Sequence, residues 1–301
     1  MNLAQRIKDI TFPNPILLAS GTYGFGQKFK EIINLTGGVI TKTITFNPIV
    51  GNPPPRIYEF EGGIINSIGL ENPGAIYFKN KILPTLKNLD TNLIVSVGGT
   101  SLEEIVNVIK IVEEEIISAY ELNLSCPNIK EGGISLGQDP KLVENICQEV
   151  KKITKKSIIA KIPTFFCNPL VIAQSAERGG ADFITITNTI PGLVIDIERQ
   201  KPFLGGISGG ISGSFLKYYA LYLIAKIRNI VKIPIIGCGG VRSYQDVLEY
   251  LFCGAVLVEI GSLNLSNPFM VIKIIEDIKK WGKEKEIKSI KEIIRKIKIE
   301  L

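Results

Sequence analysis

Apolar and polar positions are grouped in blocks along the chain, and the blocks follow two different periods. Short, nearly continuous apolar runs predict strands that are buried on both faces, as in a parallel sheet. Eight such runs occur, at Ile16–Ser20, Val39–Thr43, Leu93–Val97, Tyr120–Ser125, Ile158–Ile162, Phe183–Thr187, Ile235–Cys238 and Val256–Ile260. Longer segments with apolar residues three and four positions apart predict helices between them, at Leu102–Ile117, Pro140–Lys155, Pro169–Arg178, Phe215–Val231 and Tyr244–Phe252.

Strands that alternate with helices favour parallel βα units, and eight of them predict a closed (β/α)8 TIM barrel. An open, doubly wound sheet is the competing architecture, but no GxGxxG turn follows the first strand. Two insertions exceed the plain repeat, at Asn47–Leu70 after the second strand and at Pro191–Ser214 after the sixth. Lys279–Lys298 keeps Ile at helical spacing and predicts a solvated helix on the rim. No linker or repeat divides the sequence, so residues 1–301 are expected to form a single domain.

Composition limits the chemistry. The 301 residues include no histidine, which excludes Ser–His and Cys–His catalytic pairs and HExxH zinc sites. The scattered cysteines form no CxxC pair, which favours free thiols in a reducing compartment and no metal site. Neither a secretory signal nor a membrane-spanning stretch is apparent, so a cytoplasmic protein is expected. The net charge of +6 is concentrated near the C-terminus and forms no basic stripe of the kind that binds nucleic acid.

The residues at the carboxyl ends of the predicted strands are the candidates for a site, because barrels of this kind place their active sites there. Lys42 and Lys161 follow apolar strands, where a charge without a partner would be costly to bury. They either reach the surface or face an anionic ligand or a ring that gains negative charge. Amide and hydroxyl side chains stand at the other strand ends: Ser20, Thr43, Ser96, Asn123, Thr187, Asn188 and Thr189.

Glycine-rich turns follow the last two strands, at Gly239–Gly240 and Gly261–Ser262. Barrels of this class commonly bind a phosphate at these two turns, where backbone N–H groups can approach it closely. Ser243 begins the helix after the first turn and fits the same picture. A third segment, Gly209–Gly213, precedes a helix and is expected to be a loop that closes over the same ligand.

Cys126 is the candidate for moving a proton, because it begins the loop after the fourth strand among polar neighbours. A thiol has an ordinary pKa of about 8.5 and acts as a base where its surroundings stabilise the thiolate. The remaining cysteines are expected to behave as small hydrophobic residues: Cys147, Cys167, Cys238 and Cys253.

Several segments match, in order along the chain, the motifs of one enzyme family. They are ASGTYGFG from Ala19, TKTIT from Thr41, GNPPPR from Gly51, NSIGLENPG from Asn66, NLSCPN from Asn123 followed by KEGG, TNT from Thr187, GGISG from Gly209, IIGCGGV from Ile235 and the IGS turn from Ile260. In these segments the chain resembles the class 1 dihydroorotate dehydrogenases over nearly its whole length. The resemblance implies an FMN-carrying (β/α)8 barrel that oxidises (S)-dihydroorotate to orotate in de novo pyrimidine biosynthesis.

The resemblance also implies roles for single residues. Cys126 would take the proton from C5 of dihydroorotate while hydride leaves C6 for N5 of the flavin, and Lys42 would lie between flavin and substrate. The residues implied to bind the pyrimidine and its carboxylate are Lys42, Asn66, Ser67, Ile68, Gly69, Leu70, Asn123, Asn128, Asn188 and Thr189. Those implied to bind FMN are Ser20, Lys42, Thr43, Asn123, Lys161, Thr187, Gly213, Gly239, Gly240, Gly261 and Ser262, together with Ser96, where many relatives have asparagine.

The KEGG sequence after Asn128 resembles the class 1B branch, which reduces NAD+ with the help of an iron–sulfur subunit that carries FAD. This chain has no dinucleotide fingerprint and no cluster-binding set of cysteines, so NAD+, FAD and a 2Fe–2S cluster are expected on that partner. The resemblance further implies a homodimer of this chain within a heterotetramer.

Four alternatives remain open at this point. The chain could belong to the fumarate-dependent class 1A branch, or resemble the dihydropyrimidine dehydrogenase type, which often has histidine where Asn128 stands. A phosphate-binding lyase or aldolase barrel would instead use Lys42 or Lys161 to form a Schiff base. A non-catalytic scaffold is the last alternative, and the polar residues gathered at one barrel mouth argue against it.

Overall fold

The computed structural model describes residues 1–124 and 136–301. Its centre is a closed barrel of parallel strands in the ring order β3-β4-β7-β8-β9-β10-β15-β16. The bounds are β3 (Ile16–Leu18), β4 (Gly38–Ile40), β7 (Asn92–Val97), β8 (Ile117–Asn123), β9 (Ser157–Lys161), β10 (Phe183–Ile186), β15 (Ile235–Cys238) and β16 (Ala255–Ile260). All eight predicted strands are present, and the predicted (β/α)8 barrel is confirmed.

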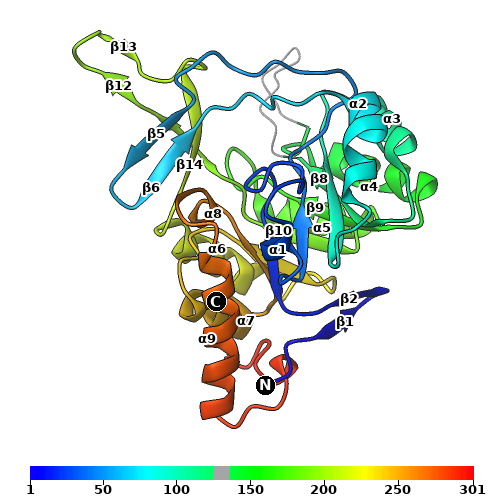
Figure 1. Cartoon of the computed structure of the whole chain (residues 1–301), viewed down its shortest axis with the longest axis vertical. Coiled ribbons are helices and arrows are strands. Elements are labelled where there is room, and N and C mark those ends of the chain that lie inside the picture. The colour runs from blue at the N-terminus through cyan, green and yellow to red at the C-terminus, as the bar shows by residue number, and fades with distance from the viewer. Residues whose placement is uncertain (125–135) are drawn as a thin grey trace.

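Helices cover the outside of the barrel (Figure 1). The longer ones are α3 (Leu102–Val112), α4 (Pro140–Ile153), α5 (Pro169–Arg178), α6 (Leu216–Ile227), α7 (Tyr244–Cys253) and α9 (Met270–Glu284). The shorter ones are α1 (Lys30–Ile33), α2 (Ala75–Tyr77), the π-helical turn η1 (Phe78–Ile82), the 3-10 turns η2 (Leu83–Leu86) and η3 (Ile290–Glu292), and α8 (Leu263–Ser266). The five predicted helices are confirmed within a few residues at their ends.

The helix predicted at Lys279–Lys298 is wrong in its bounds. Helix α9 spans Met270–Glu284, so it starts earlier and stops well before the end of the predicted segment. Glu286 takes a left-handed φ of 56°, which an α-helix cannot contain. The chain then turns back, and Ile290 and Ile293 are completely buried, so the isoleucine spacing marks a packed tail and no solvated helix.

The two insertions fold together into one sheet, which we call the cap sheet. Its strands follow the order β11-β14-β6-β5, so strands from the two insertions lie next to each other. Their bounds are β5 (Ile57–Phe60), β6 (Gly63–Asn66), β11 (Ile190–Leu193) and β14 (Ser208–Gly213). A separate ribbon, β12 (Ile195–Asp196) with β13 (Lys201–Pro202), extends beyond it at the upper left of Figure 1.

The Gly-rich segment Gly209–Gly213 was expected to be a loop, and this expectation is wrong because the segment forms most of strand β14. Its glycines are needed for close packing against β6. A Cβ added to Gly209 would lie 2.4 Å from the carbonyl oxygen of Asn66, and one on Gly213 would lie 2.3 Å from that of Gly62. Glycine at these positions lets the backbones of β14 and β6 approach each other closely.

The barrel interior is filled in two layers. At the amino ends of the strands, the hairpin β1 (Gln5–Ile7) and β2 (Ile10–Phe12) closes the barrel. Its apolar side chains pack against Leu17, Ile40, Ile94, Ala119, Ile159, Phe183, Ile236 and Leu257. Side chains two positions apart on a strand share a face, so the next inward positions form what we call the polar layer. Its members are Ala19, Ser96, Glu121, Lys161, Thr185, Cys238 and Glu259. Lys42 has the equivalent position after β4, but its side chain is partly exposed and points to Glu71 outside this layer.

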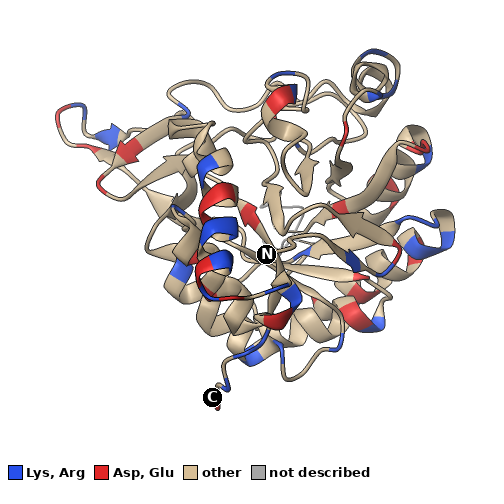
Figure 2. Ribbon diagram, turned by 60° about the horizontal axis from the view of Figure 1, so that its bottom comes forward, with Lys and Arg blue, Asp and Glu red and all other residues tan. Residues whose placement is uncertain are grey.

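Many charged residues lie on the outer helices, where Lys and Arg are interspersed with Asp and Glu in the view of Figure 2. In that view the charges do not separate into faces of one sign, which agrees with the small net charge of +6. Within residues 1–124 and 136–301, no helix has the length and apolar content that a membrane crossing requires.

Candidate active site

Polar side chains from several strands meet at the carboxyl end of the barrel, which we call the mouth. Thr43 Oγ1 lies 2.9 Å from Ser96 Oγ and 3.5 Å from Ser20 Oγ. It also accepts a hydrogen bond from Asn123 Nδ2 at 3.1 Å. Asn188 Nδ2 donates to Asn123 Oδ1 at 3.4 Å and extends the chain of contacts to β10. The structure thus brings together five residues that the sequence placed at separate strand ends.

Ser96 and Thr187 stand below the surface of the mouth. Ser96 is fully enclosed, and its hydroxyl faces Thr43, so any effect of Ser96 on a ligand passes through Thr43. Thr187 Oγ1 lies 2.8 Å from Thr164 Oγ1 and donates to the carbonyl oxygen of Asn188 at 2.9 Å. These hydroxyl groups therefore hold Thr43 and Asn188, their more exposed neighbours, in place.

The cap sheet supplies the other side of the mouth. Asn66 Nδ2 donates to the Gly210 carbonyl at 3.1 Å, and Ser67 Oγ donates to the Ser208 carbonyl at 2.7 Å. The exposed residue Thr189 donates its backbone N–H to Asn188 Oδ1 at 2.7 Å. Its side chain packs against Gly210 of β14.

The backbone after Asn66 is also held by the protein. Ile68 accepts a hydrogen bond from the Asn52 N–H at 3.0 Å, and Leu70 takes a left-handed φ of 53°. The neighbouring Gly69 leaves no room for a Cβ, which would lie 2.6 Å from the Asn52 nitrogen. Residues 66–70 thus form a preorganised edge of the mouth.

Lys42 is the positively charged group at the mouth. Its side chain is half-buried, and its Nζ lies 4.0 Å from Glu71 Oε2, which Arg56 Nη1 contacts at 2.5 Å. Burial lowers the pKa of Lys42, the Glu71 carboxylate raises it and the Arg56 guanidinium lowers it again, with a net decrease. Glu71 is shared with Arg56, so Lys42 is only partly neutralised by the protein.

Lys161 finds its anionic partners inside the barrel. Its Nζ lies 2.6 Å from Glu259 Oε2 and 3.6 Å from Glu121 Oε2. Burial alone would lower the pKa of Lys161, but the two carboxylates outweigh burial and raise the pKa above its ordinary value. Neither glutamate was predicted as a site residue from the sequence. The sequence feature that could have identified them is a single carboxylate in a mostly apolar strand, as in AYELN for Glu121 and LVEI for Glu259.

The turn after β15 depends on glycine. Gly240 has a φ of +68°, and a Cβ there would lie 2.6 Å from the backbone nitrogen of Lys217 at the start of α6. The expectation that Ser243 helps to hold a phosphate is not supported. Asp246 Oδ2 accepts the N–H groups of Arg242 at 2.8 Å and of Ser243 at 2.9 Å, so a carboxylate of the chain itself already occupies the start of α7.

The turn after β16 leaves open space. A Cβ added to Gly261 would have Ala19 Cβ, 4.0 Å away, as its nearest neighbour. The backbone N–H groups of Gly240, Gly261 and Ser262 donate no hydrogen bond to the described parts of the chain. Free N–H groups beside open space fit a phosphate group.

Two residues of the expected site, Cys126 and Asn128, lie outside the described residues, and their roles remain predictions. The last described residues before them are Asn123, at the end of β8, and Leu124. Within residues 1–124 and 136–301, no three side chains of the metal-binding types are grouped closely enough to hold a metal ion.

A family model described as dihydroorotate dehydrogenase matches residues 2–281. The chain belongs to the dihydroorotate dehydrogenase family. It is 40% identical over 302 residues to a protein of Thermoanaerobacter pseudethanolicus, with 100% of both chains covered. It is 42% identical over 301 residues to a protein of Caldicellulosiruptor bescii (99% of this chain, 100% of the relative) and 37% identical over 301 residues to one of Bacteroides fragilis (99% of each). All three relatives are named "Dihydroorotate dehydrogenase B (NAD(+)), catalytic subunit". The resemblance found in the motifs is confirmed.

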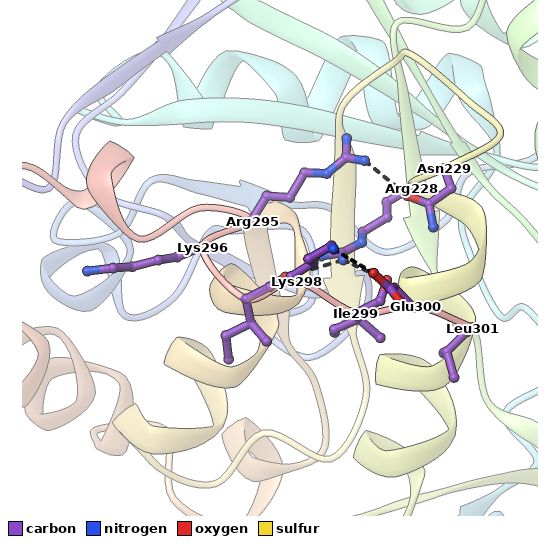
Figure 3. A pocket seen from close by; sticks show the side chains of 9 residues that line it. Arg228, Asn229, Arg295, Lys296, Lys298, Ile299, Glu300 and Leu301 are labelled. Carbon is purple, nitrogen blue, oxygen red and sulfur yellow. Dashed lines mark hydrogen bonds and ion pairs between the residues drawn. The ribbon is translucent and has the colours of Figure 1, made fainter.

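The protein also has a cavity of about 630 Å³ near its C-terminus, shown in Figure 3. None of the expected site residues lines it. Arg228 donates to the carbonyl oxygens of Cys253 (2.7 Å), Ile297 (3.3 Å) and Ile299 (3.4 Å), while Lys296 points away from the other side chains. The Arg228 guanidinium thus holds the C-terminal segment against the barrel. The cavity lies where this segment packs on the barrel and is not part of the candidate site.

Proposed function

We propose that this chain is the FMN-binding catalytic subunit of an NAD+-linked dihydroorotate dehydrogenase, with residues 1–301 acting as one domain that oxidises (S)-dihydroorotate to orotate. Membership of the family supports the reaction. The observation that carries the proposal in the structure is the mouth, where Thr43, Asn123 and Asn188 form a continuous hydrogen-bonded chain beside Lys42. Full-length relatives named as NAD(+)-linked catalytic subunits support the choice of acceptor.

The residues present fit FMN. The free N–H groups of Gly240, Gly261 and Ser262 suit its phosphate, with Gly239 and Gly213 allowing close approach of the backbone. Hydroxyl and amide groups suit the polar edge of the flavin and the ribityl chain; these are Ser20, Thr43, Asn123 and Thr187, with Lys42 and Lys161 as cations and Ser96 acting through Thr43. Bound FMN supplies the hydride acceptor.

Side-chain amides orient the substrate. A pyrimidine ring presents both N–H and C=O edges, and an asparagine amide both donates and accepts hydrogen bonds. We assign this task to Asn66, Asn123, Asn128 and Asn188, with Thr189 and the backbone of Ser67, Ile68, Gly69 and Leu70 completing the edge. Lys42 faces the negative charge of the substrate carboxylate, because Glu71 neutralises it only in part.

Cys126 is the proposed general base. Its thiolate would accept the proton that leaves C5 of dihydroorotate, and the hydride that leaves C6 would pass to bound FMN. The products would then be orotate, reduced FMN and a protonated thiol. We further propose that the partner subunit carries FAD and a 2Fe–2S cluster and passes the electrons to NAD+, and that two copies of this chain form a dimer within a heterotetramer located in the cytoplasm.

The proposal is tested by adding L-dihydroorotate to the FMN-loaded chain without oxygen and recording the flavin spectrum. Prompt bleaching is expected. A flavin that stays oxidised would contradict dihydroorotate as the substrate, and failure to bind FMN at all would contradict the cofactor. Borohydride trapping tests the lyase alternative, which Lys161 does not favour because its ion pair with Glu259 keeps it protonated.

A further inference from the structure

Three charged groups lie within the polar layer and are shielded from water. Glu121 and Glu259 are 0% exposed and Lys161 is 6% exposed. They come from β8, β16 and β9, so the group spans the inside of the barrel. In the register of the barrel Lys161 lies beside Asn123 of the mouth on one side and Thr185 on the other, which places the group directly beneath the candidate site.

The charges of this group do not balance if all three side chains are ionised. Two carboxylates and one ammonium ion would leave a net negative charge in the barrel interior. An uncompensated buried charge is strongly unfavourable, and a protein usually avoids it by changing the protonation state of the group. One retained proton makes the group neutral. Cys238, which faces the same space, stays a neutral thiol because burial raises its pKa.

Hydrogen-bond geometry favours Glu121 as the carboxyl group that holds the proton. Glu259 accepts hydrogen bonds from Lys161 Nζ at 2.6 Å and from Thr185 Oγ1 at 2.9 Å, as a carboxylate does. Neither carboxyl oxygen of Glu121 has a hydrogen-bond partner in the described residues. Burial, and then the nearby Glu259 carboxylate, raise the pKa of Glu121 well above its ordinary value, and Lys161 offsets only part of this increase.

We propose that Glu121 is a neutral carboxylic acid in the barrel interior and that Glu259 is a positioning residue, which fixes the Lys161 ammonium ion beneath the mouth. The group is then neutral, with a single ion pair between Lys161 and Glu259. The part of this proposal that concerns flavin binding rests on the proposed function, whereas the location of the proton does not.

The location of the proton is tested on the FMN-free chain by infrared spectroscopy at pH 7. Exposed carboxyl groups are ionised at this pH because their ordinary pKa values are about 4. A protonated carboxyl group absorbs at a higher frequency than a carboxylate and than the amide bonds, and it shifts in heavy water. We expect this band in the parent chain and none in Glu121→Gln.

Two further variants test the charge balance itself. In Glu259→Gln, Glu121 becomes the only carboxyl partner of Lys161 and is expected to ionise, so the band disappears although Glu121 is still present. In Lys161→Met both carboxyl groups are expected to be protonated, and the band grows. A parent chain without the band, or a band that persists in either glutamine variant, would overturn the proposal. If Lys161→Met does not fold, the bands of Glu121→Gln and Glu259→Gln alone decide whether the proton lies on Glu121.

The positioning role of Glu259 is tested by titrating each folded variant with FMN and following flavin fluorescence. Glu259→Gln moves the partner of Lys161 from β16 to β8, and FMN binding is expected to weaken about tenfold or more, as when a charge-assisted hydrogen bond is lost. Glu121→Gln replaces a neutral group with a neutral group and is the matched control, with an affinity close to that of the parent chain. Equal affinities in both variants would overturn the positioning role. A parent chain with the expected band that binds no FMN would refute the proposed function and leave the proton assignment intact.

Discussion

The Lys42 ammonium ion is maintained by neighbours that act in opposite directions. Partial burial and the Arg56 guanidinium favour the neutral amine, while the Glu71 carboxylate favours the ammonium ion. Glu71 also contacts Arg56 at 2.5 Å, so its removal would both take away the favourable charge and leave Arg56 without its anionic partner. The charge of Lys42 at alkaline pH therefore depends on Glu71.

This dependence predicts the effect of Glu71→Gln on orotate binding. Without Glu71 the pKa of Lys42 falls further, so the ammonium ion is lost at a lower pH than in the parent chain. Orotate affinity, measured by titration across the alkaline range, is expected to start falling at a correspondingly lower pH. Glu61→Gln, in the exposed turn of the β5–β6 hairpin, is the control and should leave the profile unchanged. Identical profiles in all three proteins would contradict the role given to Lys42.

The role of Cys126 predicts a separation between cofactor binding and chemistry. Cys126→Ala should bind FMN normally, yet reduce it with dihydroorotate roughly 10²–10⁴-fold more slowly, as expected when a general base is missing. Anaerobic stopped-flow measurement of flavin reduction gives this rate. Cys126→Ser is the companion variant and should recover activity mainly at high pH, because a hydroxyl ionises far less readily than a thiol. Near-normal reduction by the alanine variant would remove Cys126 from the mechanism.

Residue chemistry was predictable from the sequence only in part. Lys42 and Lys161 give the same signal, a lysine at the end of an apolar strand, but one lies half-buried at the mouth and the other inside the barrel. The partners of Lys161 stand 40 residues before it and 98 residues after it, as Glu121 and Glu259. No local pattern contains that pairing, because it exists only once the barrel is closed.

At the scale of elements, the two glycine turns have different requirements. Gly240 is needed by the fold itself, because its φ of +68° and the nearby Lys217 nitrogen exclude a side chain. Gly261 is not needed by the described chain, since the space beside it is open. A glycine that the fold does not require is expected to serve the ligand.

This contrast predicts that Gly261→Ala folds normally but binds FMN poorly. The free energy of unfolding of the FMN-free chain should change by less than about 1 kcal/mol. FMN affinity should fall at least about tenfold, because the added methyl group occupies the space that the phosphate needs. Urea denaturation and fluorescence titration measure the two quantities. In Gly240→Ala the stability itself should fall, and an unchanged FMN affinity in Gly261→Ala would contradict the phosphate assignment.

Strands and helices were predicted well where the pattern is local, as in the barrel strands and the outer helices. The cap sheet was missed for a different reason. Its strands are only partly apolar, and the two insertions meet only through the central pair β6 and β14, with Asn66 paired to Gly210. The sequence showed two insertions of unusual length, but it contained no sign that they form one sheet.

For the whole molecule, the question is where the electrons go after the flavin. The sequence has no histidine and no GxGxxG turn after its first strand, and the described residues hold no group that could bind a metal ion. We therefore expect the FMN-loaded chain alone to oxidise dihydroorotate with an artificial dye but not to reduce NAD+ at an appreciable rate. Addition of the proposed iron–sulfur partner subunit is expected to allow NAD+ reduction, measured as NADH absorbance. Full NAD+ reduction by the chain alone would contradict the division of labour, and efficient turnover with fumarate would favour the class 1A branch.

The shared cap sheet also determines when during protein synthesis this site can first exist. Strand β6 is complete at Asn66, but its neighbour β14 ends only at Gly213, and β16 closes the barrel against β3 later still. A nascent chain therefore carries an unpaired β6 edge while about half of the protein is still being translated. Unpaired edges are prone to pair with other chains, so this hairpin depends on protection at the ribosome during that time.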